Sequence, residues 1–187
     1  MLRYVRGRPR STPRRALFLD RDGILNRRIP DGYVVHPQEF EPIPLALRSA
    51  RSAQSADAAL VVVTNQGAIA RNRATESQIL GIHGQLLTWL SGAGVHLDGI
   101  YTCPHHPQSE DVDRRECECR KPKPGLLLAA AQDLSLDLST SMMIGDQPSD
   151  IAAALAAGIA EENALLVGEA DEAWLTNAVS NWANRTP

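Results

Sequence analysis

Three short apolar segments of the chain each end in a residue with a polar side chain. They are residues 16–20, which end in an aspartate, residues 59–64, a β-branched run that ends in a threonine, and residues 141–146, which end in an aspartate. Continuous apolar runs of this length are typical of parallel strands that are covered on both faces. Helix-forming sequence lies between them, so the pattern predicts βαβ units and a mainly parallel sheet.

The rest of the chain alternates in the same way between strand and helix patterns. We expect strands at 16–20, 59–64, 100–102, 141–146 and 164–167, and helices at 45–57, 75–90, 125–133, 149–158 and 171–183. Residues 26–44 and 103–125 are long irregular segments. The predicted fold class is α/β, a doubly wound, Rossmann-like sheet with helices on both faces and no large cap domain. Ligands bind such sheets outside the carboxyl ends of the strands, and Asp20, Thr64 and Asp146 lie at these ends.

The first strand end carries two aspartates two residues apart. Asp20 and Asp22 are followed by Gly23. Like charges this close repel each other unless a cation or a proton lies between them. Asp-x-Asp-Gly also occurs in ordinary surface turns, because Asp and Gly are turn formers. The convergence of Thr64 and Asp146 on the same rim favours a chemical centre with a cation over a plain turn.

The first fifteen residues differ from the rest of the chain in charge. They carry six arginines and no acidic residue, whereas the net charge of the whole chain is −3. We expect residues 1–15 to be a disordered basic tail and residues 16–187 to form a single domain. Binding of nucleic acid by the tail is the alternative. With neither a secretory signal nor an apolar run near the roughly 18 residues of a membrane helix, we expect a cytoplasmic protein.

All three cysteines of the chain lie in one short stretch. Cys103, Cys117 and Cys119 fall in the second irregular segment, together with His105 and His106. An odd number of clustered cysteines does not make a disulfide framework, whereas three thiolates and an imidazole suit a tetrahedral Zn²⁺ site. Free cysteines with incidental histidines are the alternative, and either histidine could be the fourth ligand.

Four short motifs resemble, in the same order, those of haloacid-dehalogenase-like phosphatases. The motifs are Asp20-Arg-Asp-Gly-Ile-Leu-Asn26, Thr64-Asn65-Gln66, Arg120-Lys121-Pro-Lys-Pro-Gly125 and Gly145-Asp146-x-x-x-Asp150. With Cys103-x-His105 and Cys117-x-Cys119 between them, the chain is similar to the group that contains D-glycero-D-manno-heptose-1,7-bisphosphate 7-phosphatases and histidinol phosphatases. The resemblance extends from about Leu17 to Gly168.

The resemblance implies a magnesium-dependent phosphatase whose catalytic residues lie on the strand ends. Asp20 is the implied nucleophile, which forms an aspartyl-phosphate that water hydrolyses, and Asp22 is the implied general acid and base. The hydroxyl of Thr64 and the ammonium of Lys121 would bind the moving phosphoryl group and neutralise its charge. Mg²⁺ would be held by Asp20, the backbone carbonyl of Asp22, Asp146 and, directly or through water, Asp150.

The same resemblance assigns the other site residues. The implied substrate-binding residues are Asn26, Asn65, Arg71 and Arg120. Arg120 suits a second phosphate, because a guanidinium can grip phosphate in bidentate fashion. The implied zinc ligands are Cys103, His105, Cys117 and Cys119. The Cys-x-His spacing of the family favours His105 over His106, and this closed site would be structural and would pin the loop that ends in Arg120 and Lys121.

We therefore expect a phosphoric monoester hydrolase that removes the 7-phosphate of D-glycero-D-manno-heptose 1,7-bisphosphate. The alternatives are a histidinol-phosphate phosphatase, which shares the motifs, and a zinc-stabilised nucleic-acid-binding module that uses the arginine tail. We expect the protein to be a monomer that binds a small phosphorylated sugar. We expect it to bind neither a membrane nor nucleic acid. Four residues depart from the family pattern and bear on substrate preference: Gly67-Ala68 replace Ser-Gly, Asn72 replaces Gly, and Gln147 replaces a basic residue.

Overall fold

The sheet has six strands, five of which run parallel to their neighbours. The computed structural model describes residues 1–168 and 172–185, and within them the strand order is β1-β4-β3-β2-β5-β6. The strands are β1 (Leu2–Val5), β2 (Ala16–Leu19), β3 (Ala59–Asn65), β4 (Gly99–Cys103), β5 (Met142–Gly145) and β6 (Ala164–Leu166). β2 to β6 form the parallel part of the sheet, and β1 pairs with β4 in antiparallel orientation at one edge.

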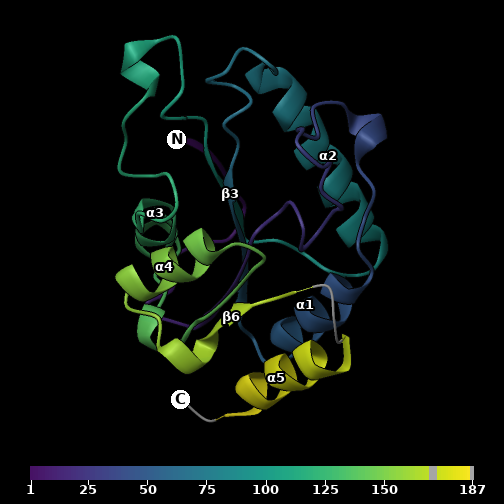
Figure 1. The fold of residues 1–187 in the computed structure, drawn as a ribbon. Helices are drawn as coiled ribbons and strands as arrows, with labels where there is room; N and C mark the ends of the chain where they lie inside the picture. Colours follow the sequence, from purple (N-terminus) through teal and green to yellow (C-terminus); the bar gives the residue numbers. More distant parts are fainter. Residues whose placement is uncertain (169–171, 186–187) are drawn as a thin grey trace.

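Helices cover both faces of this sheet. They are α1 (Leu45–Ser55), α2 (Glu76–Gly92), α3 (Gly125–Leu134), α4 (Pro148–Ala156) and α5 (Glu172–Asn184). Figure 1 shows α3 and α4 on one side of the sheet and α1, α2 and α5 on the other. The predicted doubly wound α/β fold is therefore confirmed. Among the described residues, no helix is both long and apolar enough to cross a membrane.

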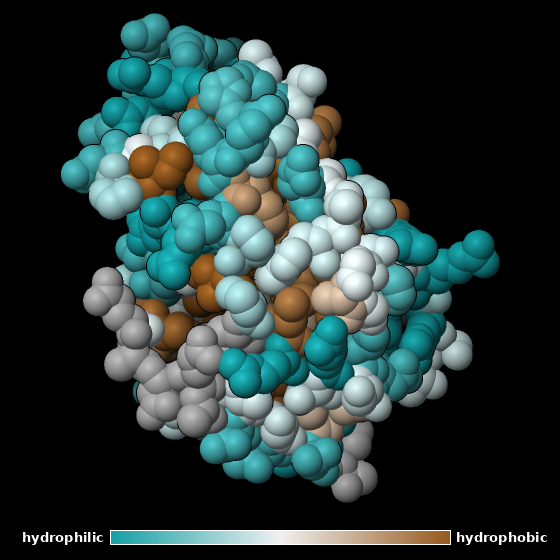
Figure 2. Space-filling view, turned by 90° about the vertical axis from the view of Figure 1, so that its right-hand side faces the viewer, coloured by the Kyte–Doolittle hydropathy of each residue, from teal (hydrophilic) through white to brown (hydrophobic). Residues whose placement is uncertain are grey.

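Successive residues of the central strands point to opposite faces and pack in two separate cores. Leu17 and Leu19 of β2 belong to the core under α1 and α5, whereas Phe18 belongs to the core under α3 and α4. All four residues of β2 are buried, because the strand is covered on both faces. The outer surface of α1, α2 and α5 is mainly hydrophilic, with hydrophobic residues in small groups (Figure 2). The continuous apolar runs of the sequence therefore mark strands buried between two helical layers.

The helix boundaries agree with the predictions to within a few residues. Thr75 caps α2, and its hydroxyl accepts a hydrogen bond from the Gln78 backbone N–H at 3.2 Å. The helix predicted at 149–158 begins at Pro148, since the Gln147 backbone N–H donates to the Asp150 carboxylate at 3.0 Å and makes Gln147 the N-cap. The last helix begins at residue 172, and residue 171 of the predicted range lies outside the described residues.

The N-terminal segment differs from the predicted disordered tail. Residues 2–5 form β1, and Arg3 donates to the Asp133 carboxylate at 3.0 Å. Arg14 forms an ion pair with Asp98, and the guanidinium of Arg15 donates to backbone carbonyls near the end of α5. The physical reason is that carboxylates distant in the sequence neutralise the arginines and hold the segment against the sheet.

Candidate active site

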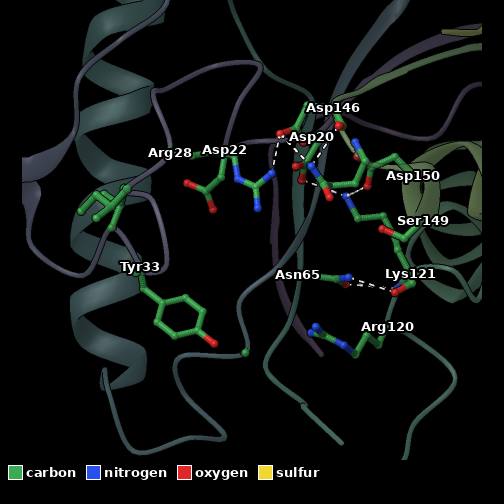
Figure 3. Close-up of a pocket in the computed structure, with 15 residues that line it drawn as sticks. Asp20, Asp22, Arg28, Tyr33, Asn65, Arg120, Lys121, Asp146, Ser149 and Asp150 are labelled. Atoms are coloured by element: carbon green, nitrogen blue, oxygen red, sulfur yellow. Dashed lines mark hydrogen bonds and ion pairs between the residues drawn. The ribbon is translucent and has the colours of Figure 1, made fainter. Parts of the chain in front are cut away.

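The carboxyl ends of three adjacent strands bring the predicted catalytic residues together. β2 lies between β3 and β5, so Asp20, Thr64 and Asp146 occupy neighbouring strand ends. One carboxylate oxygen each from Asp20, Asp146 and Asp150 lie within 4.8 Å of one another. A pocket of about 260 Å³ opens over them and is lined by polar and charged side chains (Figure 3). The sheet therefore delivers a cluster of acids to the floor of one pocket.

Lys121 is the positive charge at the floor of this pocket. Its Nζ lies 2.8 Å from Asp20 Oδ1 and 2.7 Å from Asp150 Oδ1, and it donates to the Val63 carbonyl at 2.7 Å. The side chain is 1% exposed. Burial on its own would lower the pKa of Lys121, but the two carboxylates outweigh it and raise the pKa above its ordinary value. The lysine is therefore a fixed ammonium.

Asp20 lies in a site with more negative than positive charge. Burial raises its pKa to about 6, and Asp150 and Asp22 act in the same direction, while Lys121 acts against them. Asp20 and Asp150 share the one buried ammonium of Lys121. A further cation at this point would stabilise the ionised form of Asp20.

Asp22 is held by donors on three sides. Its carboxylate accepts hydrogen bonds from Arg21 Nη2 at 2.9 Å, from Asn26 Nδ2 at 2.9 Å and from Gln66 Nε2 at 2.8 Å. Burial would raise the pKa of Asp22, but the charge of Arg21 and the hydrogen bonds from Asn26 and Gln66 lower it below the ordinary value. The implied acid–base role suits a carboxyl of raised proton affinity, whereas the free site favours the ionised form of Asp22.

Asp146 packs against the turn that follows Asp20. Gly23 adopts φ +93°, and a Cβ at this position would overlap the Asp146 carboxylate. Arg28 Nη1 donates to Asp146 Oδ2 at 2.9 Å. Asp146 Oδ1 is buried and has no hydrogen-bond partner among the described residues. An oxygen of this kind beside two other carboxylates is a suitable ligand for a divalent cation.

Two of the four predicted substrate-binding residues line the pocket. Arg120 lies on the wall opposite Arg28, and its Nη1 donates to the His105 carbonyl at 3.0 Å (Figure 3). The side-chain amide of Asn65 pairs with the backbone of Lys121: Nδ2 donates to the carbonyl at 3.0 Å, and Oδ1 accepts from the N–H at 3.1 Å. Asn65 therefore holds the loop that carries the lysine.

The other two predicted substrate-binding residues lie beside or behind the pocket. Asn26 is fully buried, and its Nδ2 bonds to Asp22 and to the Arg27 carbonyl. The exposed Arg71 donates to the Tyr33 hydroxyl at 3.0 Å, with its guanidinium 5.9 Å from the ring centroid. Arg71 thus fastens the loop 26–44, of which Tyr33 lines the pocket.

The predicted zinc ligands form a compact cluster behind Arg120. Cys119 Sγ lies 3.5 Å from Cys117 Sγ and 3.3 Å from His105 Nδ1, and Cys103 Sγ lies 3.7 Å from Cys117 Sγ. With Zn–S and Zn–N bonds of about 2.3 and 2.1 Å, a tetrahedral site requires ligand separations of about 3.5–3.8 Å. The shortest of the observed separations, 3.3 Å, is about 0.2 Å below this range and the others lie within it, so the four atoms suit a zinc ion.

The neighbouring histidine points elsewhere. His106 Nδ1 accepts a hydrogen bond from the Gln108 backbone N–H at 3.1 Å, and the ring lies against Gly67. His105, which faces the sulfurs, is therefore the histidine of the cluster, and His106 is not.

Sequence reasoning missed several residues that shape the site. Arg21 and Gln66 stand inside recognised motifs, yet their contacts with Asp22 depend on the direction of their side chains. Arg28 and Tyr33 come from the irregular loop 26–44, whose proline-rich sequence signals a functional loop without indicating which residues face the pocket.

The chain is similar to known phosphatases in sequence. Residues 118–181 match the model of the HAD-hydrolase-like family. Curated relatives include D-glycero-β-D-manno-heptose-1,7-bisphosphate 7-phosphatases of Yersinia pestis and Escherichia coli (strain K12). Each is 41% identical over 174 residues, which cover 89% of this chain and 92% and 90% of the relatives.

The chain is also similar to solved structures of phosphatases. A protein of Mesorhizobium loti described as a HAD-like phosphatase superimposes with a TM-score of 0.85 at 31% identity, covering 98% of this chain and 94% of that one. The D,D-heptose 1,7-bisphosphate phosphatase of B. bronchiseptica, complexed with magnesium and phosphate, has a TM-score of 0.69 at 33% identity and covers 78% of each chain. The chain belongs to the haloacid-dehalogenase-like hydrolases and, within them, to the family of these heptose-bisphosphate phosphatases. Membership makes it a phosphoric monoester hydrolase.

Proposed function

We propose that this protein removes the 7-phosphate of D-glycero-D-manno-heptose 1,7-bisphosphate with the help of Mg²⁺. The observation that carries the proposal is the buried ion pair between Lys121 and Asp20, at 2.8 Å, on the floor of a pocket flanked by Arg28 and Arg120. A carboxylate that is fixed by a lysine and faces a pocket flanked by two arginines can attack a bound phosphate ester. The substrates named for the relatives supply the sugar.

The proposed reaction has two steps at Asp20. First, a carboxylate oxygen of Asp20 bonds to phosphorus while the bond from phosphorus to the sugar oxygen breaks, and Asp22 gives a proton to the leaving sugar oxygen. Water then attacks the aspartyl-phosphate, with Asp22 taking its proton, and releases inorganic phosphate. Thr64 and Lys121 bind the phosphoryl oxygens throughout. The substrate dianion beside Asp22 raises its proton affinity, which the three donors lower in the free site.

A magnesium site is supported by the three clustered carboxylates. Asp20, Asp146 and Asp150 place oxygens within 4.8 Å, and the partnerless Oδ1 of Asp146 is available to a cation. The backbone carbonyl of Asp22 would complete the set. When bound, Mg²⁺ supplies positive charge that stabilises the phosphoryl group during transfer.

We also propose that the cysteine cluster holds a structural Zn²⁺. The closed set of Cys103, His105, Cys117 and Cys119 leaves no position for substrate. The Arg120 backbone N–H donates to Cys117 Sγ at 3.3 Å, so the zinc loop positions the arginine of the pocket. The three free thiols suit a reducing compartment, and we place the protein in the cytoplasm as a monomer.

The test is phosphate release with Mg²⁺ across the two anomers of the heptose bisphosphate, fructose 1,6-bisphosphate and histidinol phosphate. We expect the heptose bisphosphate to be hydrolysed with the highest kcat/KM. Asp20→Asn should abolish turnover because the amide is no nucleophile, and the exposed Asp113→Asn is the matched control that should retain it. Preference for histidinol phosphate, or substantial turnover by Asp20→Asn, would refute the proposal.

A further inference from the structure

Arg28 is a cation of the pocket wall whose partner belongs to the magnesium site. It lies on the loop 26–44, lines the pocket, and directs Nη1 at Asp146 Oδ2 from 2.9 Å (Figure 3). Its side chain is 51% exposed, whereas that of Asp146 is 13% exposed. The guanidinium therefore reaches inward from the solvent to a carboxylate on the pocket floor.

The pair with Asp146 competes with a divalent cation. A divalent cation bound by Asp146 would lie beside the guanidinium of Arg28. The two positive groups would repel each other. An ion pair whose guanidinium is half exposed to water is weak, so the metal can displace the arginine. Arg28 would then remain at the pocket wall without its carboxylate.

The freed guanidinium meets the requirements of a phosphate-binding group. It is planar, permanently charged and able to donate two parallel hydrogen bonds to phosphate oxygens. Lys121 at the pocket floor is already committed to Asp20 and Asp150, whereas the half-exposed Arg28 stands further out, across the pocket from Arg120 (Figure 3). Its position suits the phosphate that is retained on the sugar rather than the one that is transferred.

We propose that Arg28 binds the retained phosphate of a sugar bisphosphate, and that Asp146 holds its guanidinium until Mg²⁺ displaces it. The inference rests on the proposed function, which it deepens by naming a residue that selects bisphosphates over monophosphates. Arg28 acts in turn on two anionic partners, first the metal ligand and then the substrate.

A metal titration tests the contact between Arg28 and Asp146. Mg²⁺ binding to the full chain is measured by calorimetry without substrate, for the wild type, Arg28→Gln and Arg27→Gln. We expect Arg28→Gln to bind Mg²⁺ roughly three- to tenfold more tightly, because Asp146 loses its competing cation. Arg27 is the matched control, since it is the adjacent residue, pairs with Glu41 at 2.8 Å and changes the net charge equally. Equal Mg²⁺ affinity in the two variants overturns the inference.

Steady-state kinetics at saturating Mg²⁺ test whether Arg28 binds the retained phosphate of the substrate. The substrates are the heptose 1,7-bisphosphate and the heptose 7-phosphate, which share the transferred phosphate. We expect Arg28→Gln to raise KM about tenfold for the bisphosphate and less than twofold for the monophosphate, and Arg28→Lys to recover part of the loss. An unchanged KM for the bisphosphate, or equal changes for both esters, overturns the inference while wild-type turnover upholds the proposed function. Absence of wild-type turnover on both esters refutes the two together.

Discussion

At the scale of single residues, the site separates two aspartates that stand two positions apart. Asp20 is paired with a buried lysine, and its pKa rises to about 6 because of burial and the neighbouring acids. Asp22 is surrounded by Arg21, Asn26 and Gln66, which lower its pKa. Different surroundings thus give the two carboxyl groups different proton affinities, and in the free site it is Asp20 that has the higher one.

Gln66 should be a positioning residue for the acid–base step. Its Nε2 donates to Asp22 Oδ2 at 2.8 Å and to Thr64 Oγ1 at 2.9 Å. We predict that Gln66→Leu lowers kcat by roughly ten- to a hundredfold, a part of the 10²–10⁴ that general acid–base catalysis contributes. Loss of the hydrogen bond also raises the pKa of Asp22, so the limb of the pH–rate profile due to Asp22 should move to higher pH.

The exposed Gln132 of α3 provides the matched control for this experiment, because Gln132→Leu makes the same change of side chain away from the site. It should leave both kcat and the pH–rate profile unchanged. If the two leucine variants had the same profile, the hydrogen bonds of Gln66 would have no part in catalysis.

The sequence predicts the acids and the lysine of the site but not the residues that hold them. Asp20 and Asp146 follow from motifs at strand ends, because strand direction brings them to one rim, whereas Lys121 follows from the resemblance of its loop motif to that of the family. The contact of Arg28 with Asp146 depends on the path of an irregular loop, and short motifs do not fix that path. Asn65 shows the same limit, since its amide is engaged by the backbone of the lysine loop.

At the scale of elements, the sequence predicts the buried strands better than the edge strand. β3 is buried on both faces and is therefore recognisable as a continuous apolar run. β1 has four residues, two of them exposed, and is followed by arginines and prolines. Its pairing with β4 is non-local, since even the shortest pair, Val5 with Gly99, is 94 positions apart in the sequence, so local composition favoured disorder.

The loop 103–125 is the element whose order should depend on zinc. We predict that His105→Gln abolishes zinc binding, increases hydrogen exchange across this loop and lowers kcat/KM at least tenfold, since Arg120 and Lys121 lie at the end of the loop. Zinc content by elemental analysis and exchange by mass spectrometry are the measurements.

The next residue supplies a matched variant for the zinc experiment. His106 Nδ1 accepts from the Gln108 N–H and is turned away from the sulfurs, so His106→Gln should retain about one zinc per chain. Loss of zinc from His106→Gln, or full zinc content in His105→Gln, would contradict the assignment of ligands.

At the scale of the whole molecule, the layers that form the site also bury an ionisable group behind it. α2 covers the sheet on the side of α1 and α5, and its His83 is 4% exposed (Figure 1). His83 Nε2 has no hydrogen-bond partner among the described residues. Burial lowers the pKa of His83 to about 3, and the nearby charge of Arg21 acts in the same direction. Protonation of this residue is therefore coupled to unfolding.

The stability of the whole protein should consequently fall as the solution is acidified. An unfolded histidine binds a proton below about pH 6.5, whereas folded His83 does so only near pH 3, so protons favour the unfolded chain between these values. From pH 7 to pH 5 the wild type should lose about 2 kcal/mol more unfolding free energy than His83→Leu, measured by urea denaturation. The exposed His96 is the matched control, and His96→Leu should follow the wild type. If His83→Leu instead showed the same pH dependence as His96→Leu, the prediction would be wrong, because the imidazole of His83 would then be protonated in the folded protein as readily as in the unfolded chain.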